Sequence, residues 1–101
     1  MFQALRRIAA DGSAGCPGDV YGQTRRCLEI IADAVKDAAF SLDTVVRTRI
    51  MLTAVSQWEA AARAHGEFFV AIRPATTFVE VKGFINREWL VEVEADCVAD
   101  S

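Results

Sequence analysis

Apolar residues recur at helical spacing in two separate parts of the chain. From Val20 to Ala39 they fall every three or four positions, which predicts an amphipathic helix over this range. Asp19 directly precedes it and offers a carboxylate to the free amides of the first helical turn. A second helix is predicted after Ser56, a candidate N-cap, and Arg73-Pro74 ends it because the residue before a proline disfavours helical angles. Its apolar side carries Trp58, Ala61, Ala62, His65, Phe68 and Phe69.

Three further segments alternate between apolar and polar residues, the pattern of strands with one buried side. They run from Val45 to Thr53, from Thr77 to Lys82 and from Leu90 to Val98. Between the last two, Gly83 to Glu88 contain a glycine and an Asn-Arg step that suit a reversal between strands. The predicted order is therefore helix, strand, helix, strand, strand.

This order predicts an α+β fold in which two helices cover one face of a β-sheet. The covered face should carry the more apolar alternating set of each strand, namely Val46, Thr48, Ile50, Leu52, Thr77, Val79, Val81, Trp89, Val91, Val93, Ala95 and Cys97. The segment Met1 to Ala10 stays open between helix and strand. Phe2, Leu5 and Ile8 have helical spacing, but the segment is short enough to be an added strand.

The opposite face of the predicted sheet is chemically mixed, with cations on one strand and carboxylates on others. One interpretation is a solvated surface with cross-strand ion pairs, each worth ~0.2 to 1 kcal/mol. The other is a subunit interface with a polar cleft at its rim, because apolar side chains are interleaved among the charges. This face is expected to carry Arg47, Arg49, Met51, Thr76, Phe78, Glu80, Lys82, Leu90, Glu92, Glu94 and Asp96.

Composition places the 101-residue chain among ordinary globular proteins, with one domain over residues 1–101. Its net charge of −3 and pI near 5.0 disfavour a nucleic-acid partner. Cys16, Cys27 and Cys97 form no C-x-x-C pair, so we expect neither a disulfide framework nor a structural zinc site. No apolar run is long enough for a signal peptide or a membrane span, which favours a cytoplasmic location and no membrane partner.

Two motifs near the carboxyl end are specific. They read RPATTFVEV from Arg73 to Val81 and LVEVEADCV from Leu90 to Val98. Together they resemble signatures of the RidA/YjgF family, also called endoribonuclease L-PSP-like. The stretches GDVYGQTRRCLEII, SLDTVVRTRIML and HGEFF follow in the family's usual order and spacing, so that the resemblance covers about Ala10 to Ala99.

The resemblance implies a chorismate-mutase-like fold that assembles as a homotrimer, with small-molecule clefts between subunits. It also implies the chemistry of the family's deaminase branch, which hydrolyses reactive enamines and imines to 2-oxo acids and ammonia without a metal or coenzyme. In that branch an arginine after the Pro-Ala pair binds the substrate carboxylate. A glutamate, matched here by Glu92, helps to hold the attacking water.

This chain departs from the deaminase pattern at two positions. Thr76 stands where that arginine would be, and a hydroxyl cannot reproduce its two parallel bonds to a carboxylate. Phe78 occupies a position that is commonly cysteine or another small residue, and it would fill part of the cleft. Arg47 or Arg73 are the candidates to replace the arginine, whereas the alternative for Glu92 is an interfacial ion pair with Arg47 or Arg49.

The sequence also lacks the Gly-Pro-Tyr-Ser and Ser-Gly-Gln segments of the family's amino-terminal hairpin, and Met1 to Ile8 stand where the second of those strands would finish. His65 is the only histidine, and its place on the sheet-facing side of a helix favours packing over catalysis. We therefore expect a non-standard, metabolite-binding trimer. The alternatives are an imine deaminase and, with less support, a ribonuclease.

Overall fold

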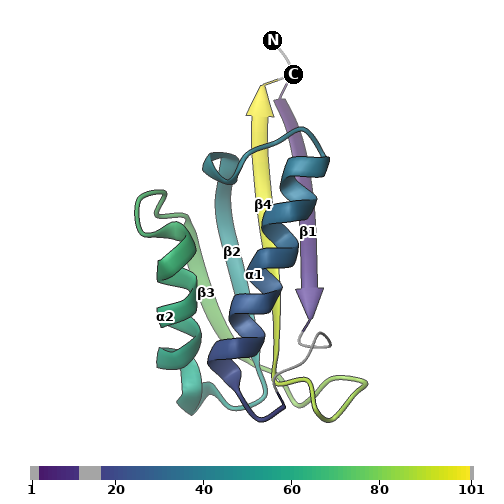
Figure 1. Ribbon diagram of the computed structural model, residues 1–101, viewed down its shortest axis with the longest axis vertical. Coiled ribbons are helices and arrows are strands. Elements are labelled where there is room, and N and C mark those ends of the chain that lie inside the picture. Colours follow the sequence, from purple (N-terminus) through teal and green to yellow (C-terminus); the bar gives the residue numbers. More distant parts are fainter. Residues whose placement is uncertain (1–2, 12–16, 101) are drawn as a thin grey trace.

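The computed structural model of the protein describes residues 3–11 and 17–100. Its four strands form one sheet in the spatial order β1-β4-β2-β3, and both helices lie on the same face of that sheet (Figure 1). The predicted α+β fold is thus confirmed. The elements are β1 (Gln3–Asp11), α1 (Val20–Asp37), β2 (Val45–Leu52), α2 (Trp58–Phe69), β3 (Ala75–Glu80) and β4 (Val91–Asp100), with short 3-10 turns at Leu42–Thr44 and Val55–Gln57.

Strand β4, the last in the chain, lies inside the sheet and pairs antiparallel with both β1 and β2. Strand β3 pairs parallel with β2 on the other side, after the crossover through α2. The predicted reversal at Gly83 to Glu88 does turn the chain round, but it does not join neighbouring strands. Strand β2 lies between β3 and β4, because the parallel crossover places β3 at the sheet's edge.

The segment left open between helix and strand is a strand over its described part. β1 pairs with β4 over its whole length, from Gln3 opposite Asp100 to Asp11 opposite Glu92. Its side chains alternate accordingly: Leu5 is 65% exposed on the uncovered face, and Ile8 packs against the core on the helix side. Met1 and Phe2 lie outside the described residues.

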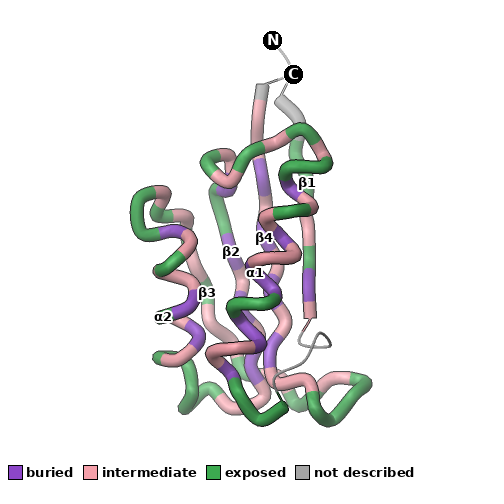
Figure 2. The backbone as a smooth tube through the Cα atoms, in the orientation of Figure 1, coloured by how far each residue is buried: buried purple, intermediate pink, exposed green. Residues whose placement is uncertain are grey.

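Helix α1 begins as predicted, because the Asp19 carboxylate accepts a hydrogen bond from the Gly22 amide at 3.0 Å. It ends at Asp37, two residues before the predicted limit, and Ala39 has a left-handed backbone with φ of 63°. Its buried stripe faces the sheet (Figure 2). Leu28 and Ile31 from this stripe are at most 1% exposed, and burying such a side chain stabilises the fold by ~1.5 to 3 kcal/mol.

Helix α2 does not begin with the predicted cap. Ser56 lies inside the 3-10 turn Val55–Gln57, and Gln57, the N-cap residue, makes no side-chain cap bond. The Glu80 carboxylate instead accepts the Val55 amide at 3.0 Å. The buried side of the helix carries Ala61, Ala64 and Phe69, whereas Trp58 is 47% exposed.

In two strands the side chains face differently from the prediction. The first difference lies at the start of β2. Val45 is 3% exposed and Val46 is 50% exposed, because the register against β4 shifts between Val45 and Arg47. Such a bulge inserts one residue and reverses the alternation. From Thr48 onward the predicted inward set holds, since Thr48, Ile50 and Leu52 are all fully buried.

The second correction concerns β3, where the inward and outward sets are exchanged. Thr76 lies opposite Thr48 and Phe78 opposite Ile50 in the parallel register, so both point to the helix side. The apolar residue Val79 lies opposite Met51 and therefore on the uncovered face. The prediction was wrong because it assigned the face by hydrophobicity, whereas an edge strand's inward positions are set by its neighbour.

The bulge in β2 predicts unequal responses to the same substitution at adjacent positions. Val45→Ala should lower the free energy of unfolding by about 2 kcal/mol, because it removes buried methyl groups. Val46→Ala should change it by less than about 0.5 kcal/mol. Urea unfolding of both variants measures the difference, and equal losses would contradict the bulge.

Candidate functional site

The open face is the face of the sheet opposite the helices, and three rows of side chains cross its middle. Adjacent rows are about 6.6 to 6.8 Å apart along a strand, because each row is two residues further on. The strand registers define their members. The first row is Asp11, Glu92, Met51 and Val79; the second is Ala9, Glu94, Arg49 and Thr77; the third is Arg7, Asp96, Arg47 and Ala75.

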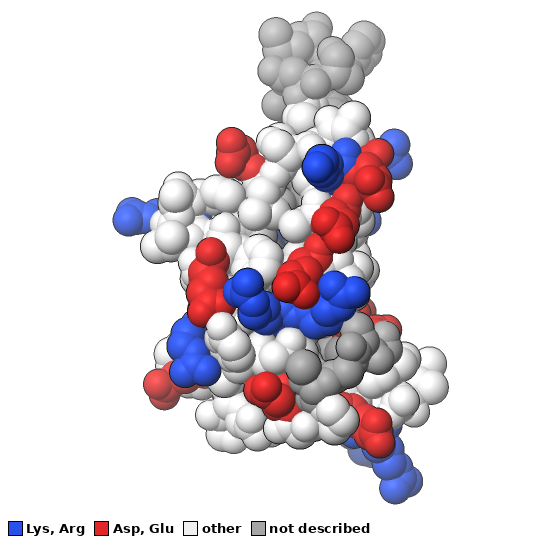
Figure 3. Space-filling view, in the orientation of Figure 1, with Lys and Arg blue, Asp and Glu red and all other residues white. Residues whose placement is uncertain are grey.

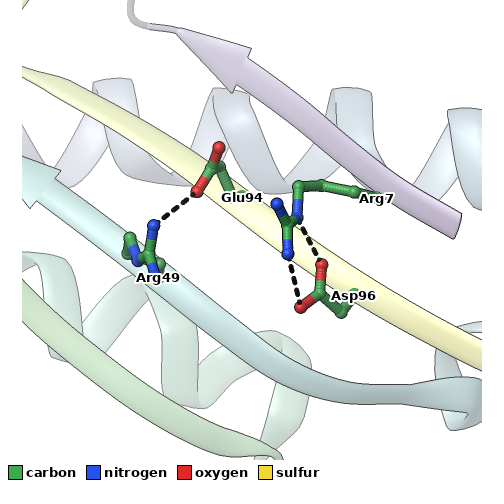
Figure 4. A network of polar contacts seen from close by, with 4 residues as sticks. All are labelled: Arg7, Arg49, Glu94 and Asp96. Atoms are coloured by element: carbon green, nitrogen blue, oxygen red, sulfur yellow. Dashed lines mark hydrogen bonds and ion pairs between the residues drawn. The ribbon is translucent and has the colours of Figure 1, made fainter.

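Two ion pairs join strands across these rows (Figure 4). Arg7 holds both oxygens of Asp96, with Nε to Oδ1 at 2.8 Å and Nη2 to Oδ2 at 3.5 Å. Arg49 Nη1 donates to Glu94 Oε1 at 3.3 Å. The hydrogen bond from Arg7 holds the pKa of Asp96 below its usual range, with Arg47 and Arg49 adding smaller effects.

Arg47 lies in the third row but makes no ion pair with any described residue. It does help to line a pocket of about 60 Å³ on the open face, which is thus far smaller than the roughly 300 to 1,000 Å³ of a typical ligand site. The pocket's five side chains are Arg7, Arg47, Arg49, Glu94 and Asp96. The predicted contrast of cations on one strand and carboxylates on another is thus confirmed for β2 and β4.

Glu92 lies in the first row and is partly buried. Its carboxylate forms no ion pair with Arg47 or Arg49, because Arg49 pairs with Glu94 one row away. Within one chain, Glu92 therefore forms no ion pair with either arginine, and the predicted interfacial pair stays a prediction. Burial raises the pKa of Glu92, and the carboxylates of Glu94 and Asp11 raise it further. A carboxyl group with a raised pKa can hold or release a proton closer to neutral pH.

The backbone just before Glu92 is held by Gln23, a buried residue of α1. Its Nε2 donates to the Glu88 carbonyl oxygen at 2.9 Å, and its Oε1 accepts the Leu90 amide at 2.8 Å. Both ends of one side-chain amide are therefore bonded to the segment that enters β4. This anchoring holds the chain just before β4, whose pairing with β1 and β2 places Glu92 in the first row.

Thr76 and Phe78 do not join this cluster, because they face the helices. Phe78 packs edge-on against Trp58, with ring centroids 6.0 Å apart. Arg73 lies in the turn before β3, where its Nε donates to the Val70 carbonyl oxygen at 3.4 Å, and it does not line the pocket. Of the five predicted site residues, Arg47 and Glu92 share the open face, whereas the other three do not.

The Thr76 hydroxyl belongs to a small polar network under α2. Thr48 Oγ1 lies 2.9 Å from both His65 Nε2 and Thr76 Oγ1, and Thr76 Oγ1 lies 3.2 Å from the Pro74 carbonyl oxygen. One direction of donation satisfies every group: His65 to Thr48, Thr48 to Thr76, and Thr76 to Pro74. The expected packing role of His65 is consistent with this network and with its stacking on Phe69, with ring centroids 4.7 Å apart.

Arg7 is a member of the cluster that the sequence did not single out. It belongs to an arginine pair, Arg6-Arg7, in a segment whose secondary structure was undecided. In a strand, neighbouring side chains point to opposite faces, so Arg7 and Arg6 lie on different faces of the sheet. Its partner, Asp96, could be identified only once the β1 register was known.

Metal and thiol chemistry find no support in the described part of the chain. Residues 3–11 and 17–100 contain no group of three or more His, Cys, Asp or Glu side chains placed to hold a metal ion. Cys27 and Cys97 are buried free thiols, and burial raises the pKa of Cys27 to about 12. Cys16 lies outside the described residues. Neither of the two described helices is long and apolar enough to cross a membrane.

Comparison with known families gives a direct match. The model of the family "Endoribonuclease L-PSP" matches residues 7–99. The chain belongs to the endoribonuclease L-PSP family. This is the RidA/YjgF family that the two carboxyl-terminal motifs resemble.

Curated relatives in the endoribonuclease L-PSP family include one with a named activity. An uncharacterised protein of Streptomyces coelicolor is 37% identical over 79 residues, covering 78% of this chain and 59% of that protein. A RutC family protein of Pyrococcus horikoshii is 31% identical over 78 residues, covering 77% and 61%. The 3-aminoacrylate deaminase RutC of Acinetobacter baylyi is 33% identical over 76 residues, covering 75% and 60%. The chain thus spans about 60% of the length of these relatives.

Solved structures agree with the fold. A member of the YjgF/YER057c/UK114 family from Mycobacterium tuberculosis is 39% identical with a TM-score of 0.85, covering 94% of this chain and 79% of that one. A Thermotoga maritima protein has the same TM-score of 0.85 at 23% identity, covering 96% and 80%. The second likeness concerns the fold alone.

The buried histidine predicts a pH dependence of stability. Burial lowers the pKa of His65 below its usual 6.5, so that the unfolded chain takes up a proton at a higher pH than the folded protein does. The stability that His65 contributes should be complete above about pH 6.5 and should fall as the pH drops through that value. Urea unfolding of wild type and His65→Gln from about pH 5 to 8 isolates this effect, and parallel pH profiles would contradict it.

Proposed function

We propose that the protein is a homotrimer that binds a small metabolite of the imino-acid or oxo-acid class at clefts between subunits. The observation that carries the proposal is the open face itself. No element of the described residues covers one side of the sheet (Figure 1), yet that side exposes apolar Leu5 and Val46 beside its ion pairs. Exposed apolar surface of this kind, next to polar groups, favours an interface.

The size of the pocket supports a site completed by a second copy. A single chain offers about 60 Å³ between its charged side chains, which is too little to bury a metabolite. A subunit packed against the open face would add a second wall and exclude water. The helix side is a poorer candidate for this role, because groups of acidic and of basic side chains are spread over its surface (Figure 3).

We further propose that this member binds its ligand without the standard carboxylate anchor of the deaminases. The hydroxyl of Thr76 is engaged by Thr48 on the helix side of the sheet, so it is turned away from the open face. Phe78 is likewise packed on Trp58. The position that is arginine in the deaminase branch therefore has a structural role in this chain.

The alternative is an imine deaminase, favoured by Glu92 and by the similarity to the 3-aminoacrylate deaminase of Acinetobacter baylyi. In such a reaction Glu92 would accept a proton from water as the oxygen bonds to the imine carbon. That proton would pass to the imine nitrogen, giving a carbinolamine. Glu92 would then take the proton of the carbinolamine hydroxyl and deliver it to the nitrogen as the carbonyl forms and the carbon–nitrogen bond breaks, which releases a 2-oxo acid and ammonia. The raised pKa of Glu92 suits a group that both accepts and returns a proton.

The trimer predicts a mass by light scattering of about three times 11.1 kDa. Val46→Asp should reduce that mass to one chain, because it places a carboxylate on apolar interface surface. Val70→Asp serves as the matched control: Val70 is 70% exposed just after α2, away from the open face, and this variant should remain trimeric. A wild-type mass of one or two chains would refute the assembly.

Ammonia release from freshly generated 2-aminoacrylate and bulkier 2-imino acids distinguishes the two functions. We expect no release above the uncatalysed rate, and none in Thr76→Arg, because a side chain at position 76 starts from the helix side of β3. Release that disappears in Glu92→Gln but persists in Glu88→Gln would instead establish the deaminase. Glu88 is the matched control because it lies exposed in the β3–β4 connection.

A further inference from the structure

We propose that Arg47 is the binding residue for a small monocarboxylate, held in the pocket between Arg7 and Arg49 on the open face. The inference deepens the proposed function, on which it rests for the class of ligand. In this proposal the acid group of the ligand binds to a residue of β2 and not at position 76 of β3, which is threonine in this chain.

The first argument is that Arg47 makes no ion pair with any described residue, although its charge acts on Asp96 from nearby. The antiparallel register places it opposite Asp96, the carboxylate it would be expected to pair with. Both oxygens of Asp96 are instead bound by Arg7 from the opposite side. Glu94 is held by Arg49, so the two carboxylates of the pocket each have an arginine, and Arg47 is left over.

The second argument is the charge of the pocket. Its lining contains three guanidinium groups and two carboxylates, which leaves one positive charge uncompensated. A monocarboxylate neutralises that charge. A phosphate dianion would reverse its sign beside Glu94 and Asp96, so the balance favours a carboxylate over a phosphate.

The third argument is shape. A guanidinium presents paired donors in one plane, which match the two oxygens of a carboxylate. A pocket of about 60 Å³ has room for such a group but not for a whole metabolite, so the rest of the ligand would extend over the open face. The side chains of Asp96 and Glu94 are 18% and 25% exposed, whereas those of Arg7 and Arg49 are 62% and 43% exposed. The carboxylates are therefore partly shielded from water, and the guanidinium groups face solvent.

The position of this anchor also bears on catalysis. The rows of Arg47 and Glu92 are two steps apart, so their backbone positions are separated by roughly 13 Å along the strand direction. In a small 2-imino acid the reacting carbon is bonded directly to the carboxylate carbon. A ligand held by Arg47 would therefore keep its imine carbon well away from Glu92 of the same chain, which fits binding without hydrolysis.

The test is a titration of the full chain with pyruvate, followed by the amide and arginine side-chain signals in nitrogen-15 NMR. We expect saturable shifts at Arg7, Arg47 and Arg49. Binding should weaken at least about tenfold in Arg47→Met, which keeps an apolar stem of similar length, and less in Arg47→Lys, which keeps the charge but not the paired donors. Arg87→Met, the matched control in the exposed β3–β4 connection, should bind as wild type does.

Inorganic phosphate, titrated in parallel, should bind more weakly than pyruvate, and tighter phosphate binding would overturn the assignment. So would an absence of saturation by pyruvate, or an equal loss of affinity in Arg47→Met and Arg87→Met. Light scattering of the Arg47→Met variant gives a further check. A mass below that of the wild type would also overturn the assignment, since it would mean that Arg47 pairs with a carboxylate of a second copy. Because pyruvate is not hydrolysed, the result stands apart from the ammonia assay, whose outcome tests the proposed function.

Discussion

The structure depends on the central position of β4. This strand pairs with β1 on one side and β2 on the other, so it fixes the register of three of the four strands. Its inward residues, Val91, Val93, Ala95 and Cys97, are all fully buried, and its outward residues are the carboxylates around which the open face is organised. The alternating sequence of β4 thus provides core residues on one face of the sheet and the carboxylates of the candidate site on the other.

The arginines around β4 come from chain segments that are far apart in the sequence. Arg7 and Asp96 are 89 residues apart, and Arg49 and Glu94 are 45 apart. Each exposed pair contributes little to stability on its own. Because Arg7 pairs with Asp96 and Arg49 pairs with Glu94, Arg47 is the one of the pocket's three arginines that is left without an ion pair among the described residues.

At the other edge of the sheet, the Thr76 side chain is turned toward the helices and belongs to the fold. Hydrogen bonds link Thr76, Thr48 and His65, and thereby join β3, β2 and α2. In an otherwise apolar layer, such groups stabilise the structure only while all of them are satisfied. The Thr76 hydroxyl is therefore bonded into the fold beside the histidine of α2, and we propose that the acid group of a ligand binds at β2 instead.

The sequence alone determined the fold class, both helices, the buried face of β4 and the contrast between cationic β2 and acidic β4. These features follow from local periodicity, because a strand or helix shows its own buried side in its spacing. Only the tertiary structure decided that Val45 and not Val46 is inside, that Thr76 and Phe78 face the helices, and that Arg7 joins the cluster. In each case the deciding factor was the register against a neighbouring strand, a relation between distant residues that the pattern of one segment does not contain.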